Sequence, residues 1–88
     1  MSAVLESEVL DGGRAKELLD DPTLSKMFIN LEGQYLKAWQ TTTANDTEGR
    51  ERLFHAFSVL QDIKVHLRVM ADSGQLAQEH LKRLKKGK

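Results

Sequence analysis

The sequence predicts an all-α fold, in which two long helices form an antiparallel hairpin with short flanking N- and C-terminal helices. Among its 88 residues there are only six glycines and one proline, Pro22. No segment alternates polar and apolar residues as a half-buried strand does. Two long segments instead repeat apolar residues every three or four positions, which is the spacing of an amphipathic helix.

The N-terminal part is expected to differ in order from the rest. Residues 1–13 are expected to form a flexible arm, because Gly12 and Gly13 interrupt any helix that the apolar side chains of the arm begin. Such an arm either frays at the terminus or packs on a neighbouring subunit. Residues 14–88 are expected to form a single helical domain with a basic C-terminal tail, beginning with a short helix over residues 14–19.

The first long helix is expected to begin at Pro22 and to end near Thr41. Asp21 suits the N-cap, and proline suits the first helical position because its missing N–H would have no partner there. The apolar stripe of this helix consists of Leu24, Met27, Phe28, Leu31, Tyr35, Ala38 and Trp39. Gly33 lies within the helix, where it either permits close approach of another helix or is tolerated at a cost of about 1 kcal/mol relative to alanine.

A turn over residues 41–46 precedes the second long helix, which is expected from about residue 47 to residue 73. Asn45 and Asp46 are both suitable N-caps, and Asn45 with Glu48 matches a capping box.

A glycine is expected to end this helix. Gly74 suits a left-handed C-cap, and a last short helix is expected over residues 75–85. The side chains expected to point inward from it are Leu76, Ala77, Leu81 and Leu84.

The two long helices are expected to form the core between them, because a short turn makes them adjacent and antiparallel. The main apolar stripe of the second long helix consists of Leu53, Ala56, Phe57, Leu60, Ile63, Leu67 and Met70. Four more apolar residues lie off that stripe, namely Phe54, Val59, Val65 and Val69. One neighbouring helix cannot cover both sides, so either the short helices and the arm fold over this second face or another subunit does.

The composition and spacing of residues predict a protein that is not an enzyme and has no cofactor, no metal site and no small-molecule substrate. There is no cysteine to serve as a thiolate ligand or nucleophile. His55 and His66 lie about 16 Å apart along one helix, too far to share a metal ion. Carboxylates are scattered, and neither a glycine-rich phosphate loop nor a nucleophile-elbow serine occurs.

The tip of the hairpin is a candidate contact site, where Trp39 and Arg50 are expected to meet. In one interpretation Trp39 seals the end of the core and Arg50 reaches acidic groups in the turn. In the other the tip is a recognition site, because tryptophan and arginine are frequent among the residues that dominate binding energy.

Charge is distributed unevenly along the chain. Residues 1–48 carry nine acidic and four basic side chains, and the remainder reverses this ratio. The basic cluster at the end consists of Lys82, Arg83, Lys85, Lys86 and Lys88. It suits phosphate contacts, head-to-tail contact between copies, or simply a solvated helix end that complements the helix dipole.

Several short motifs stand in a fixed order after the arm. They are Ala15-x-x-Leu18-Leu19-Asp20-Asp21-Pro22-x-Leu24, Leu31-Glu32, Tyr35, Ala38-Trp39-x-x-Thr42, Asp46-x-x-Gly49-Arg50-Glu51-x-Leu53 and Gly74-x-Leu76-Ala77. In these residues the chain resembles a group of short proteins encoded by tailed bacteriophages and prophages, among genes for packaging and virion structure. The resemblance implies a location in the host cytoplasm or the virion, and its motifs contain no known catalytic group.

The expected function is that of a phage accessory protein in virion assembly or genome packaging, acting through helix-mediated contacts with itself or with another phage protein. The expected contact residues are Trp39, Arg50, Phe54, Val59, Val65 and Val69. One alternative is a nucleic-acid-binding packaging or regulatory factor that uses the basic C-terminal helix. The other is a small phage inhibitor of a host defence protein. No membrane contact is expected, because no apolar run approaches the roughly 20 residues that a membrane span requires.

Overall fold

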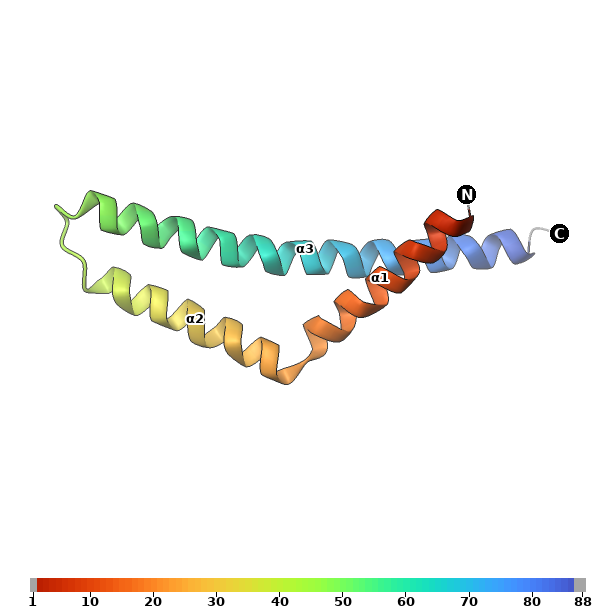
Figure 1. Ribbon diagram of the computed structural model, residues 1–88, viewed down its shortest axis with the longest axis horizontal. Coiled ribbons are helices and arrows are strands. Elements are labelled where there is room, and N and C mark those ends of the chain that lie inside the picture. The colour runs from red at the N-terminus through yellow and green to blue at the C-terminus, as the bar shows by residue number, and fades with distance from the viewer. Residues whose placement is uncertain (1, 87–88) are drawn as a thin grey trace.

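The computed structural model describes residues 2–86, and nearly all of them are helical. The helices are α1 (Ser2–Asp20), α2 (Pro22–Gln40) and α3 (Thr47–Lys86). No strand occurs in this part of the chain, so the all-α prediction is confirmed. In Figure 1 α2 and α3 run antiparallel from the turn that joins them, and α1 runs back from the far end of α2 to cross the C-terminal half of α3.

The arrangement differs from a hairpin with two short flanking helices, because α1 is as long as α2 and makes the more extensive contact with α3. The prediction that the glycine pair breaks the N-terminal helix is wrong. α1 passes through Gly12 and Gly13 without interruption, because Gly12 is buried against α3 and the contact there compensates for the low helix propensity of glycine. The segment expected to be an arm is therefore the first part of a helix.

The prediction that Gly74 ends the second long helix is also wrong. α3 continues through Gly74 to Lys86, and no glycine of the described chain has a positive φ. A Cβ atom placed on Gly74 would lie 2.7 Å from the Cα atom of Gly12, so the missing side chain allows the two helices to touch. Two residues after Gly74 that were expected to point inward are exposed instead. Leu76 exposes 66% and Leu84 exposes 51% of its surface.

The helix starts follow local side-chain chemistry. Asp21 caps α2 as predicted, because its Oδ1 accepts hydrogen bonds from the backbone N–H groups of Thr23 at 2.8 Å and Leu24 at 2.9 Å. At the start of α3 the cap is Asp46, whose Oδ1 accepts from the N–H of Gly49 at 3.0 Å. The capping box predicted from Asn45 is therefore replaced by a cap one residue later.

The chain buries little of itself. The buried apolar side chains of the described residues are Ala15, Leu60 and Ala77. The radius of gyration of the Cα atoms is 18.8 Å, whereas a compact domain of this length has one of about 12 Å. The principal extents are 66 × 24 × 14 Å, so the molecule is a long, thin layer of helices rather than a globule.

Gly33 is tolerated rather than required for close packing. A Cβ atom built on Gly33 would meet nothing within 4 Å. We therefore expect Gly33→Ala to raise the free energy of unfolding by about 0.5–1 kcal/mol, because alanine loses less backbone entropy in a helix. Thermal unfolding followed by circular dichroism, at one chain concentration for both proteins, measures this. A lower melting temperature would show that α2 needs a glycine there.

Candidate protein-contact surface

One flank of α3 carries a row of exposed apolar side chains. From Phe54 the stripe continues to Val65, Val69 and Leu76, at intervals of eleven, four and seven residues. Each interval is close to a whole number of helical turns, so the four side chains point to the same side along about 33 Å of helix.

α2 widens this stripe. Ile29 and Leu36 are seven residues apart and therefore share one side of α2. Each helix can be viewed along its own axis from its N-terminus. In an antiparallel pair, side chains that are rotated in the same direction away from the helix–helix contact then lie on the same side of the pair. Leu36 and Phe54 accordingly line one pocket. We define the broad apolar face as the six residues Ile29, Leu36, Phe54, Val65, Val69 and Leu76.

The broad apolar face is open to solvent along its whole length. The exposed fractions of its side chains run from 53% at Val69 to 68% at Ile29. Large apolar side chains that gather, exposed, on one side of a molecule are typical of interaction sites. Neither α1 nor the C-terminal end of α3 covers this face. The sequence left two possibilities open, cover by other parts of the same chain or cover by another subunit, and the first does not apply to this face.

Val59 is exposed but does not belong to this face. It follows Phe54 by five residues, which turns it by about 140° around the helix axis. Ile63 and Met70 lie on the same flank as Val59, and both are exposed. α1 packs on this opposite flank, because a Cβ atom on Gly12 would lie 2.7 Å from the backbone oxygen of Met70. From the sequence, Val59 is expected on one face with Phe54, Val65 and Val69. In the structure Val59 lies on a separate face, which α1 partly covers.

The tip brings Trp39 and Arg50 together as expected. The guanidinium carbon of Arg50 lies 4.1 Å from the centre of a Trp39 ring, which is a cation–π geometry. Within the described residues Arg50 forms no ion pair, so the predicted contact with acidic groups of the turn is absent. Trp39 itself is 42% exposed and therefore seals the end of the core incompletely.

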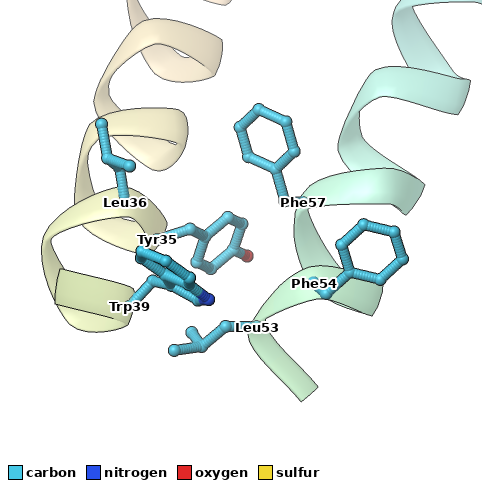
Figure 2. A pocket seen from close by; sticks show the side chains of 6 residues that line it. All are labelled: Tyr35, Leu36, Trp39, Leu53, Phe54 and Phe57. Carbon is cyan, nitrogen blue, oxygen red and sulfur yellow. The ribbon is translucent and has the colours of Figure 1, made fainter. Parts of the chain in front are cut away.

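Beside this pair the two helices enclose a small apolar pocket of about 180 Å³. Its lining residues are Tyr35, Leu36, Trp39, Leu53, Phe54 and Phe57. In Figure 2 Tyr35, Trp39 and Leu53 extend into the space between α2 and α3. Small-molecule sites are usually larger, at roughly 300–1,000 Å³, and contain a few placed polar groups. This pocket has room for one large apolar side chain.

One ion pair joins α2 to α3. The Lys64 Nζ atom donates a hydrogen bond to Glu32 Oε1 at 2.9 Å and lies 6.0 Å from the centre of the Phe28 ring. The hydrogen bond from Lys64 lowers the pKa of the Glu32 carboxyl, partial burial opposes this, and Gln61 adds a smaller lowering. The Nε2 atom of Gln61 is itself buried without a hydrogen bond of good geometry.

The lowered pKa of Glu32 predicts a pH dependence of stability. A carboxyl group whose pKa is lower in the folded chain than its ordinary value of 4.5 stabilises the fold above that value. The stabilisation is lost as the pH falls through the folded pKa. We therefore expect the difference in unfolding free energy between the wild type and Glu32→Gln to shrink between pH 7 and pH 3. Urea unfolding at several pH values measures it, with Glu51→Gln as the control, and a difference that grows in acid would contradict the assignment.

The basic cluster lies at the end of α3. Its described members, Lys82, Arg83, Lys85 and Lys86, are all exposed, whereas Lys88 lies outside the described residues. No aromatic residue is interleaved with them. The cluster therefore offers charge to an anionic partner but no surface on which bases stack.

Two further observations concern the described residues alone. No three histidine, cysteine, aspartate or glutamate side chains gather there in a group that could hold a metal ion. None of the three helices combines the length and the apolar composition of a membrane span.

The broad apolar face could be foreseen only in part. Phe54, Val65 and Val69 are identified from the sequence as contact residues. Leu76 is expected from the sequence to point inward, and no role is given to Ile29 or Leu36. The feature that indicates all three is an interval of seven or eleven residues to another exposed apolar residue of the same helix. Comparisons with protein-family models, curated proteins and solved structures find no match to this chain.

Proposed function

We propose that this chain is a phage accessory protein, not an enzyme, that acts in virion assembly or genome packaging through helix-mediated protein contacts. The observation that supports this is the broad apolar face, which the described chain leaves open. The phage setting, and with it a location in the host cytoplasm or the virion, rests on the motif resemblance. Inhibition of a host defence protein would use the same kind of contact and differs only in the partner.

The energy available from such a contact is substantial. Burying one fully exposed valine, leucine, isoleucine or phenylalanine side chain contributes about 1.5–3 kcal/mol. All six side chains of the broad apolar face expose more than half of their surface, so several kcal/mol are gained when a protein partner covers them. The stacked Trp39 and Arg50 at the edge of this face are residue types that often anchor such interfaces.

Site-specific photo-crosslinking tests the proposal. A photoreactive amino acid at Val69, on the broad apolar face, is compared with one at Arg52, which is exposed on α3 and lies about 160° around the helix from Phe54. In cells that produce virions, we expect a covalent adduct to a virion or packaging protein, or to the chain itself, from Val69 and not from Arg52. The absence of any adduct from Val69 would contradict the proposal.

The basic end of α3 supports one alternative, a nucleic-acid-binding packaging or regulatory factor, because its described basic side chains are all exposed. In that case the full-length chain binds duplex DNA at low salt, and binding weakens steeply as salt is added. Replacing Lys82, Arg83, Lys85 and Lys86 by glutamine should abolish the binding. If the wild type does not shift DNA at 20 mM salt, this alternative fails.

A further inference from the structure

We propose that the partner on the broad apolar face is a second copy of this chain, packed so that the two α3 helices run antiparallel about a twofold axis at Val65. The inference rests on the proposed function, since it names the partner of the same face. Three observations support it: the surface area of the chain, the order of apolar residues along α3, and the distribution of charge.

The first observation is the amount of exposed surface. The accessible surface of the chain is 7153 Å², whereas a folded monomer of 10 kDa exposes about 5,200 Å². Each chain therefore exposes about 1,900 Å² too much. If two copies hide that excess from each other, the interface totals about 3,800 Å², which falls in the range of obligate homodimers, about 2,000–5,000 Å².

The second observation is that the apolar stripe of α3 complements itself. Phe54 and Leu76 lie at equal distances of eleven residues on either side of Val65. A twofold axis at Val65 therefore places each Phe54 beside Leu76 of the partner subunit, at the rim of the apolar pocket that Phe54 helps to line. A twofold interface requires this property, because the same patch must fit itself. Leu5 and Glu8 of α1 line a shallow pocket together with Leu76. Leu76 still exposes 66% of its surface, so α1 leaves it accessible to the partner.

The third observation is charge. Between Phe54 and Leu76 the stripe contains one charged residue, Asp72. The antiparallel register places Asp72 opposite Ser58 of the partner subunit. It also places the basic end of α3 level with the acidic turn of the partner, which contains Asp46 and Glu48. A parallel register would instead bring two Asp72 carboxylates together and two basic ends together, which is unfavourable.

Engineered cysteines test the register directly, because the chain has none of its own. In the full-length chain, Val65→Cys is expected to form an intermolecular disulfide rapidly under mild oxidation. His66→Cys is the matched control, because it is the next residue on the same helix but points about 100° away. Equal rates for the two variants would overturn the assignment of the face.

A mixing experiment tests the direction of the helices. When Phe54→Cys and Leu76→Cys chains are mixed, we expect the mixed disulfide to form at least about tenfold faster than the Phe54→Cys homodimer. Faster formation of the homodimer would show a parallel register and overturn the proposal. These variants replace exposed side chains, and circular dichroism checks that each keeps the wild-type helix content.

The second copy and the proposed function fail differently. If Val65→Cys forms no dimer while the photoreactive group at Val69 reaches another protein, the partner is not a second copy of this chain, and the proposed function stands. If neither position forms an adduct, both are wrong.

Discussion

Gly12→Ala is expected to lower the free energy of unfolding by roughly 1–3 kcal/mol, although alanine favours a helix more than glycine does. The added Cβ atom would lie 2.5 Å from the Cα atom of Gly74 and 2.7 Å from the backbone oxygen of Met70. Both are backbone atoms that no side-chain rotation can move, so α1 must separate from α3. For a domain of this size the melting temperature should fall by about 5–15 °C.

The neighbouring glycine provides a matched control. A Cβ atom on Gly13 would meet nothing within 4 Å, so Gly13→Ala should raise the melting temperature by a few degrees through helix propensity alone. Thermal unfolding of both variants at one chain concentration gives the comparison. If the two substitutions have the same effect, the backbones of α1 and α3 are not in contact at this crossing.

Leu60→Ala is expected to cost about 2–5 kcal/mol, through lost burial and the cavity left behind. Leu60 is 7% exposed, and the two other buried apolar side chains are alanines. An 88-residue domain is stable by about 4–13 kcal/mol in total, so this one substitution removes a large share. Urea unfolding should show a lower midpoint than that of the wild type.

Val59→Ala is the control for Leu60→Ala, because Val59 precedes it on α3 and is 57% exposed. It lies outside both the core and the broad apolar face, and alanine favours helix more than valine. We expect its stability to equal or slightly exceed that of the wild type. A loss as large as that of Leu60→Ala would place Val59 in an interface.

The sequence predicted the features that depend on neighbouring residues. The start of α2 follows from Asp21 and Pro22, whose chemistry acts within one helical turn. The start of α3 at Thr47 followed from the turn residues before it. Helix periodicity was equally informative, since Leu60, predicted to be in the core, is the largest buried side chain.

Features that depend on distant contacts could not be predicted in the same way. A glycine in isolation disfavours a helix, and both Gly12 and Gly74 were interpreted on that basis. Their pairing across 62 positions of sequence converts two weak points into a close backbone contact between α1 and α3. Nothing local to either residue indicates that the other will lie against it.

The candidate site was predicted by the same reasoning and shows the same limit. The surplus of apolar residues on α3 identified Phe54, Val65 and Val69, which are exposed. It also included Val59, because a count of apolar residues off the main stripe does not separate one flank from the other. Ile29 and Leu36 were missed because their membership depends on how α2 is oriented against α3.

The thin core and the open face have one physical cause: the chain is too flat to cover its own apolar surface. Sedimentation equilibrium of the full-length wild type between 1 and 100 µM tests the consequence most directly. We expect a mass of about 20 kDa, twice that of one 10.0 kDa chain, with dissociation on introducing Val65→Glu but not His66→Glu. A folded, fully helical species that stays at 10.0 kDa across this range would contradict it.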